Sequence, residues 1–304
     1  MLENTPTIQW VRYKGYSGCR IDGTVPVPRP ETLSHMERAY FLATQLESPC
    51  YGAVQSYDGT GLSAGPFHHV AIYPKTLGQG SLFSLLSRME LGQPATPSML
   101  SLLSAYRSRG WAITAAGILN NFRSGKPISG SAILNEFAPI KGAVPKKGPL
   151  WEKAQRWAYL HHRVFADPTM FEIQKNFAID WLISGQKATE AAAYSDRDMR
   201  TLMVEKDLSL AEDLALCTYH AFSVNAPGPA QEILNGALRQ ASRANVPGRI
   251  LDGFSRSLFG NWKSRYLRTR SAAMSAGLWP TSFFAGPSAI FPLRAAVTGS
   301  GPVA

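Results

Sequence analysis

Residues 47–65 read ESPCYGAVQSYDGTGLSAG and join a predicted helix to a predicted β-hairpin. The residues before this stretch step by three or four along one helical face. They are Leu33, Met36, Tyr40, Ala43 and Glu47. This spacing predicts a helix over residues 31–47, which the Ser-Pro pair after Glu47 ends. The glycine-rich segment 50–80 contains an Asp-Gly turn signal and predicts a small hairpin or loop region.

Glu47 occupies the apolar stripe of this helix at its last turn, where a leucine would be expected. A carboxylate there is partly desolvated and lies near the negative end of the helix dipole, and both effects favour the protonated acid. A protonated carboxyl group is what a general acid needs to donate a proton to a leaving oxygen near neutral pH. The alternative is that Glu47 turns out to solvent at a frayed helix end.

Asp58 opens a glycine-bearing turn eleven residues after Glu47. Its carboxylate is expected to stay ionised, because such turns surround an acid with backbone NH groups. Two carboxylates in unlike environments are the arrangement that glycoside hydrolysis uses. Glu47 and Asp58 are therefore the candidate catalytic pair, and Ser63 is a candidate for holding an attacking water beside Asp58. The alternative for this motif is an ordinary Asp-Gly turn.

Glu47, the DGTGLSAG run at 58–65 and the GQGSLFSLL run at 78–86 resemble the lysozyme superfamily. The resemblance is closest to chitosanase-like enzymes and to bacterial and phage peptidoglycan hydrolases, in which a D-G-x-G hairpin follows a helix-end glutamate. It is specific over residues 47–86 and weaker over 35–277. It implies a mainly α, α+β lysozyme-like fold with a small β-hairpin at the active-site cleft. It also implies a general acid at Glu47, a second carboxylate at Asp58 and a water-orienting hydroxyl at Ser63.

Two positions depart from the family pattern. Residues 66–70 read PFHHV where relatives carry a short ALQWN run, and residues 219–221 read YHA where the family has FDI. The catalytic positions survive both changes, whereas the substrate subsites near 66–77 do not follow the family.

Candidate substrate-binding residues surround the predicted catalytic hairpin. Tyr51 and Tyr57 flank it and are candidates for stacking on sugar rings, with a core position as the alternative. His68 and His69 follow the hairpin and are candidates for lining a sugar cleft. Gln79 lies in a Gly-Gln-Gly turn that is expected to face the same cleft.

No metal site and no cofactor are predicted. The adjacent histidine pairs at 68–69 and 161–162 point their side chains apart on a strand and diverge on a helix, so neither is a ready chelate. Three cysteines without CxxC spacing favour free thiols over a disulfide framework or a thiolate zinc site. They are Cys19, Cys50 and Cys217.

The composition favours an anionic partner. The chain has 304 residues, with 31 basic and 21 acidic side chains and a formal charge of +10. Such a balance suits nucleic acid, anionic lipid or an acidic cell wall, but the positive charges are scattered, so no specific nucleic acid is expected. No apolar run reaches the roughly 18 residues needed to span a bilayer. The N-terminus lacks a cationic start followed by an apolar segment, so no Sec signal peptide is expected.

The expected organisation has three parts: an extended N-terminal arm or hairpin at 1–30, a helical catalytic domain at 31–277, and an apolar Gly- and Pro-rich tail at 278–304. Such a tail packs on its own domain or docks on a partner. Residues 120–149 are expected to be mostly loop. Further helices are predicted over 81–90, 98–109, 150–165, 169–183, 186–193, 208–222, 229–243 and 262–276.

These features predict a lysozyme-like hydrolase that acts on peptidoglycan glycan strands. The expected setting is a phage virion or injection machine, with contacts to other virion or baseplate proteins through residues 1–30 and 278–304 and delivery to the bacterial cell wall or periplasm. Lytic transglycosylase chemistry and a chitosan substrate are alternatives. A structural component of a phage particle with an inactive lysozyme-like domain is the alternative of a different class.

Overall fold

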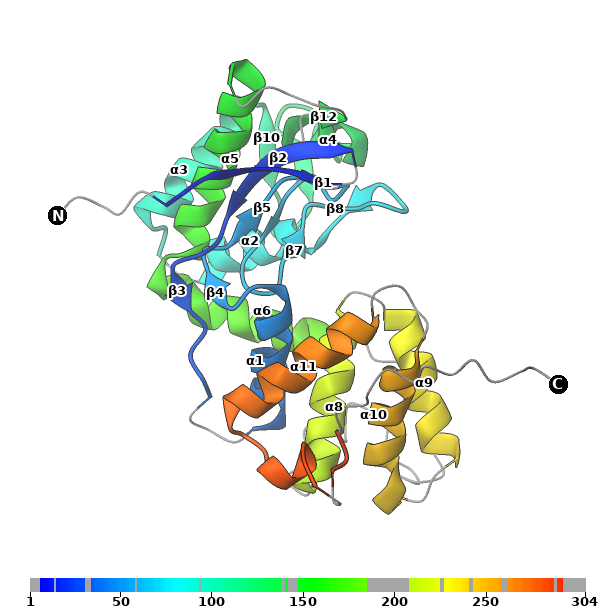
Figure 1. Ribbon diagram of the computed structural model, residues 1–304. Coiled ribbons are helices and arrows are strands. Elements are labelled where there is room, and N and C mark those ends of the chain that lie inside the picture. Colours follow the sequence, from blue (N-terminus) through cyan, green and yellow to red (C-terminus); the bar gives the residue numbers. More distant parts are fainter. Residues whose placement is uncertain are drawn as a thin grey trace. The chain divides into compact units, whose positions relative to one another are not determined.

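The computed structural model is mainly helical with small antiparallel sheets, which confirms the predicted mainly α, α+β fold class (Figure 1). It describes residues 6–13, 15–30, 34–57, 59–92, 94–137, 140–141, 147–184, 208–224, 227–240, 243–257, 262–286 and 289–291. The chain forms two compact units. Unit 1 comprises Met1–Val27 and Glu47–Ala178, and unit 2 comprises Pro28–Leu46 and Ile179–Ala304.

Unit 1 contains an antiparallel sheet with the strand order β1-β2-β5-β6-β7, in which β12 also pairs with β2. Its strands are β1 (Gln9–Tyr13), β2 (Tyr16–Ile21), β5 (Val54–Gln55), β6 (Ser63–Ala64), β7 (His69–Val70) and β12 (Ile140–Lys141). Three separate two-stranded ladders accompany it. They are β3 (Val25–Pro26) with β4 (Cys50–Tyr51), β8 (Ile72–Tyr73) with β9 (Gly78–Gln79), and β10 (Trp111–Ile113) with β11 (Leu119–Asn121).

The helices of unit 1 form its main core together with this sheet. They are α2 (Ser81–Gly92), α3 (Pro97–Ser108), α4 (Gly130–Phe137), α5 (Pro149–Phe165) and the start of α6 (Phe171–Ser184). Helix α3 begins where the Thr96 hydroxyl caps the Met99 amide and Pro97 occupies the first turn. The ring of Tyr106 packs against Phe137 and Trp157, which joins α3, α4 and α5. Such aromatic contacts bury large apolar areas and contribute strongly to core stability.

The organisation differs from the predicted boundary at residues 30 and 31. The expected N-terminal arm contains the hairpin β1–β2, and β2 pairs onward with β5, so these residues belong to the central sheet. Gly18 is needed there, because a Cβ atom on it would lie 1.8 Å from the carbonyl oxygen of Ser56. The arm therefore contributes to unit 1, and its predicted contact with virion proteins stays a prediction.

Buried histidines make unit 1 sensitive to acid, and His161 and His69 are two of them. His161 on α5 is fully buried, with Nε2 accepting from the Tyr106 hydroxyl at 2.9 Å and Nδ1 donating to the Trp157 carbonyl at 2.8 Å. Burial lowers the pKa of His161 from 6.5 to about 4, although the hydrogen bond to Trp157 opposes the shift. Burial, with a smaller effect of His68, lowers the pKa of His69 to about 3. Both side chains are therefore neutral in the folded protein at neutral pH.

Since the folded pKa values lie below the unfolded value of 6.5, the neutral histidines stabilise the fold above that pH. This stability is lost as the pH falls toward the folded values. We expect the free energy of unfolding to fall by about 1.4 kcal/mol per pH unit for each histidine in that window. Urea denaturation between about pH 7 and pH 4.5 measures the slope. His161→Gln is expected to flatten it, and an unchanged slope in that variant would contradict the prediction.

Unit 2 is a helical bundle around α8 (Leu210–Ser223) (Figure 1). The other helices are α9 (Pro227–Gln240), α10 (Val246–Arg256), α11 (Trp262–Ala276) and the residues of α1 (His35–Glu47) that precede Glu47. Helix α8 starts with a capping box, in which Ser209 and Glu212 bond each other's backbone NH groups. Its residues from Glu212 to Ser223 are all buried. This burial fits a helix at the centre of a bundle, because neighbours cover it on every side.

The described part of the predicted tail packs on its own unit. Trp279, Phe284 and Phe291 are at most 5% exposed. The Arg270 guanidinium donates to the carbonyl oxygens of Phe284 and Phe291. Of the two alternatives for this tail, the structure therefore favours packing within the chain as far as residue 291, and docking on a partner stays a prediction.

Most predicted helices agree with the structure, with two differences. The prediction of a mostly loop segment at 120–149 is wrong for α4, a short helix whose Ile133 and Phe137 enter the core. Helix α10 was not predicted, because its Pro and two Gly residues resemble loop composition. Proline is nevertheless acceptable in a first helical turn. The helix predicted at 186–193 lies outside the described residues. No described helix is long and apolar enough to cross a membrane.

Candidate active site

Glu47 is the last residue of helix α1 and is half-buried. The chain directly after it is held by backbone hydrogen bonds, because Val27 N donates to the Pro49 oxygen at 2.8 Å. The β3–β4 ladder, in which Pro26 lies opposite Cys50, extends this pairing. The backbone that follows Glu47 is therefore held within unit 1 by this pairing.

Two neighbouring rows of side chains on opposite faces cross the sheet that follows Glu47. Directly opposed residues of an antiparallel sheet lie on the same face. The first row across β2, β5, β6 and β7 is Arg20, Gln55, Ser63 and Val70. The neighbouring row is Ile21, Val54, Ala64 and His69, all of them buried. The hairpin thus directs Gln55 and Ser63 to the face opposite the apolar core row.

A chain of hydrogen bonds orders the half-buried side chains of this hairpin. The Tyr57 hydroxyl donates to Gln55 Oε1 at 2.6 Å, and Gln55 Nε2 lies 3.4 Å from His68 Nδ1. His68 itself has a positive φ of 50°, which is uncommon for a residue other than glycine. The edge of the Tyr57 ring meets Tyr13, which is 47% exposed, at a centroid distance of 6.2 Å. Gln55 was not predicted, although its two-residue spacing from Tyr57 on a strand is a signal for a shared face.

Ser63 has a buried hydroxyl on this face. The residue is 1% exposed, and its Oγ has no hydrogen-bond partner among the described residues. Buried hydroxyl groups in folded proteins are nearly always hydrogen-bonded. An unpartnered hydroxyl beside the half-buried Gln55 is therefore suited to binding a water molecule or a ligand oxygen.

Asp58, the predicted second carboxylate, lies outside the described residues. Its neighbours Tyr57 and Gly59 lie in the connection between β5 and β6. In that connection Gly61 adopts a φ of +78°, a backbone conformation that favours glycine. The predicted hairpin is therefore present around this position, and the role of Asp58 stays a prediction.

Three predicted substrate-binding residues have structural roles instead. Tyr51 is 3% exposed, and its ring stacks on Phe171 at 3.8 Å, so it has no free face for a sugar. His69 is 4% exposed and is paired with Ser81 Oγ at 3.2 Å. The Gln79 amide joins segments of the core in three hydrogen bonds, donating to the carbonyls of Leu119 and Ile128 and accepting from the Leu119 amide.

The described residues thus bring Gln55, Tyr57, Ser63 and His68 together on one hairpin, which begins a few residues after the helix-end Glu47. No family model, curated protein or solved structure matches this chain. The hairpin supplies a hydroxyl for an oxygen ligand and an aromatic ring, and Glu47 supplies a carboxyl group a few residues earlier in the chain. These are the groups that acid-catalysed cleavage of a polar substrate requires.

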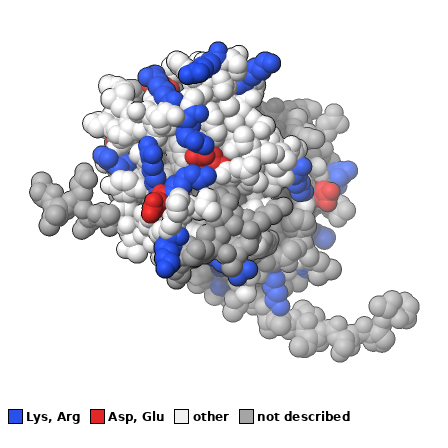
Figure 2. Space-filling model, turned by 90° about the horizontal axis from the view of Figure 1, so that it is seen from above, with Lys and Arg blue, Asp and Glu red and all other residues white. Residues whose placement is uncertain are grey.

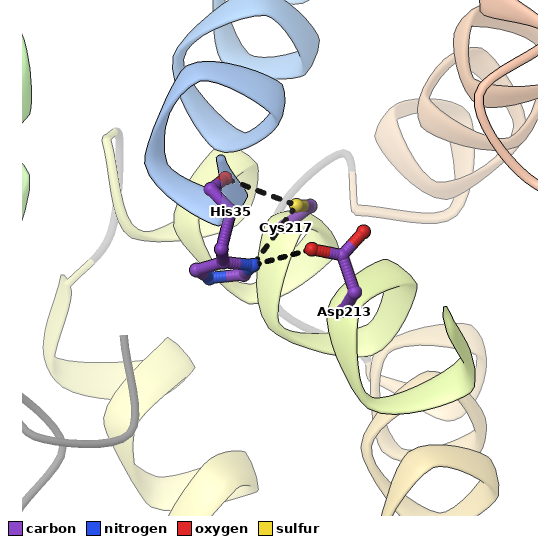
Figure 3. A group of neighbouring side chains, drawn as sticks. All are labelled: His35, Asp213 and Cys217. Atoms are coloured by element: carbon purple, nitrogen blue, oxygen red, sulfur yellow. Dashed lines mark hydrogen bonds and ion pairs between the residues drawn. The ribbon is translucent and has the colours of Figure 1, made fainter. Parts of the chain in front are cut away.

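A second polar cluster lies inside unit 2 (Figure 3). His35 from α1 and Asp213 and Cys217 from α8 have their donor atoms within 4.8 Å of one another. His35 Nδ1 lies 2.7 Å from Asp213 Oδ1 and 3.7 Å from Cys217 Sγ. All three are buried and were not predicted as a group, because 178 residues separate His35 from Asp213.

This cluster does not fit a metal site. Both oxygens of Asp213 already accept from the Arg38 guanidinium, at 2.7 and 2.8 Å, and the Trp279 indole donates to the same carboxylate at 2.6 Å. Burial by itself would raise the pKa of Asp213, but the bonds and charges of His35 and Arg38 outweigh it and lower that pKa. Burial and the nearby Asp213 raise the pKa of Cys217, so its sulfur is a thiol. A guanidinium-paired carboxylate beside a protonated thiol is a structural ion cluster.

Proposed function

We propose that this chain is a glycosidase that cleaves the glycan strands of peptidoglycan, with Glu47 as general acid and Asp58 as second carboxylate. The observation that carries the proposal is the junction at Glu47. The half-buried Glu47 ends α1, and the chain then forms an antiparallel hairpin that places Gln55 and Ser63 on one face. The Ser63 hydroxyl has no hydrogen-bond partner among the described residues. Proton donation needs an acid on a rigid element, and hydrolysis needs a polar surface to orient water.

The proposed reaction moves one proton at each carboxyl group. Glu47 protonates the glycosidic oxygen as its bond to the anomeric carbon breaks, and Asp58, with Ser63, takes a proton from the attacking water. This reaction inverts the anomeric centre if the two carboxyl groups lie about 6.5–9.5 Å apart. In a lytic transglycosylase, Glu47 acts first as acid and then as base, and a sugar hydroxyl replaces water to give an anhydro product. Neither reaction needs a cofactor.

The charge of the chain supports peptidoglycan over chitosan as the substrate. A protein with a net charge of +10 is attracted to an anionic wall and repelled by a polycation. The proposed site of action is the bacterial cell wall or periplasm, reached as a component of a phage virion or its tail. This setting rests on the resemblance to phage muramidases. The apolar tail adds less support than expected, since Trp279, Phe284 and Phe291 are buried within unit 2.

The experiment is a product analysis with the purified full chain on peptidoglycan and, separately, on chitosan. We expect soluble muropeptides from peptidoglycan, and mass spectrometry distinguishes a new reducing end from an anhydro sugar. The first product identifies a hydrolase and the second a transglycosylase. Preferential release of sugars from chitosan would overturn the substrate. Failure of the folded chain to cleave either polymer would overturn the enzyme proposal and favour a structural component of a phage particle.

A further inference from the structure

A cavity of about 400 Å³ lies in unit 1, between the C-terminal turn of α3, the end of α4 and the first half of α5. Its polar lining consists of Ser108, Arg109, Glu136, Glu152, Lys153 and Arg156. Figure 2 looks onto the face of unit 1 where α5 begins, and Lys and Arg side chains surround a few acidic ones there. The cavity contains none of the residues of the candidate active site.

Glu136 organises the cationic groups of this cavity. The residue is 5% exposed, and its Oε2 pairs with Arg109 Nη2 at 2.5 Å and with Lys153 Nζ at 3.6 Å. Its other oxygen accepts from the Trp157 indole at 2.9 Å. A buried carboxylate with three partners holds the side chains around it in fixed positions. Arg109 and Lys153 keep 52% and 30% of their side chains exposed, so they remain accessible to a ligand.

Arg156 supplies a third cation to the same cavity. It follows Lys153 by three residues on α5, which places both side chains on one face of the helix. It is exposed and forms no ion pair within the described part of the chain. Three cationic groups therefore line the cavity, and Glu136 and Glu152 are the acidic ones.

The balance of these charges defines the ligand. Three cations against two carboxylates leave an excess of one positive charge. A phosphate ester carries a matching charge of about −1 to −2 and offers several oxygens to guanidinium groups. A volume of about 400 Å³ lies in the range of small-molecule sites and leaves room for an organic group besides the phosphate.

We propose that this cavity binds a phosphorylated sugar, with its phosphate held by Arg109, Lys153 and Arg156. The Ser108 hydroxyl and the exposed Glu152 carboxylate line the remaining space and supply hydrogen-bonding groups for sugar hydroxyls. The inference does not depend on the glycosidase proposal, because it uses different residues and needs no cleavage.

Titration of the full chain with N-acetylglucosamine 6-phosphate tests the site, with N-acetylglucosamine and inorganic phosphate as comparison ligands. The Trp157 indole NH is a local NMR probe, since it donates to Glu136, which also pairs with the Arg109 and Lys153 side chains. Arg156→Gln is the test variant, because this residue has no ion pair to lose within the described structure. Arg107→Gln is the matched control, since Arg107 is also exposed but does not line the cavity.

We expect saturable binding of the phosphorylated sugar with a shift of the Trp157 signal, and weaker binding of both comparison ligands. Arg156→Gln is expected to weaken binding about ten- to hundredfold, since one charge-assisted contact is lost, and Arg107→Gln less than about twofold. Equal losses in both variants would indicate non-specific charge attraction and overturn the site. Equal affinity for inorganic phosphate would overturn the assignment to a sugar, and absence of any shift at millimolar ligand would overturn binding itself.

Discussion

Glu47→Gln is expected to lower the rate of peptidoglycan cleavage by at least about a hundredfold while leaving the protein folded. The amide has the size of the carboxyl group but cannot donate a proton to the leaving oxygen, and general acid catalysis typically contributes about 10²–10⁴-fold. Dye release from labelled peptidoglycan measures the rate, and circular dichroism checks the fold. The matched control is Glu172→Gln, because Glu172 is an exposed residue of unit 1 that pairs with nearby Lys175. Its activity is expected to stay within about twofold of the wild type.

Two further variants separate the possible roles around Glu47. Asp58→Asn is expected to reduce cleavage as severely as Glu47→Gln in an inverting hydrolase, and far less in a transglycosylase. Ser63→Ala is expected to slow cleavage about tenfold with little change in stability, since its buried hydroxyl has no partner within the described residues. Full activity in Glu47→Gln would contradict the assignment of the general acid, whatever the other variants do.

Asp213→Asn is expected to lower the free energy of unfolding of unit 2 by about 3–5 kcal/mol. The substitution keeps the shape of the side chain but removes the charge that balances the buried Arg38 guanidinium, which lies 2.7 Å away. It also weakens the bonds to His35 and Trp279. Urea denaturation followed by circular dichroism, with limited proteolysis to identify the unit that unfolds, measures the effect.

The control for this prediction is another acid of unit 2. Asp252 pairs with Arg256, and their side chains are 28% and 68% exposed, so solvent screens this pair far more than the buried pair of Asp213 with Arg38. Asp252→Asn is therefore expected to have a small effect. The double variant Arg38→Met with Asp213→Leu is expected to be more stable than Asp213→Asn, because it leaves no unbalanced charge. Equal stability of Asp213→Asn and the wild type would contradict the prediction that the Asp213 charge stabilises unit 2.

Much of the fold follows from local sequence patterns. The spacing of Leu33, Met36, Tyr40 and Ala43 predicts a helix that ends at Glu47, and α1 ends there. Local hydrophobic spacing does not predict elements whose structure depends on tertiary contacts. Helix α4 is too short for a clear period and is stabilised by burial of Ile133 and Phe137 in the core. The N-terminal hairpin looks independent in sequence, because its partner strand β5 lies more than thirty residues away.

The candidate site shows the same division. The helix-end position of Glu47 and the hairpin position of Ser63 follow from short-range spacing. The sequence left Tyr51 open between a sugar-stacking and a core position, and the structural role of Gln79 was missed, because their partners Phe171 and Leu119 are distant in the sequence. The same reason explains why the cluster of Asp213 with His35, Arg38 and Trp279 was missed. Partners that meet only in the folded chain leave no local periodicity.

The sequence distances between Asp213 and its partners Arg38 and Trp279 also bear on the order in which the protein folds during synthesis. Asp213, the carboxylate partner of Arg38, is synthesised 175 residues after it, and Trp279 follows Asp213 by 66 residues. At a synthesis rate of about 5–20 residues per second, the first interval alone lasts roughly 9–35 s. All of unit 1, which ends at Ala178, is synthesised within that time. The order of synthesis thus favours folding of unit 1 first, while Pro28–Leu46 can complete unit 2 only after the later helices have been synthesised.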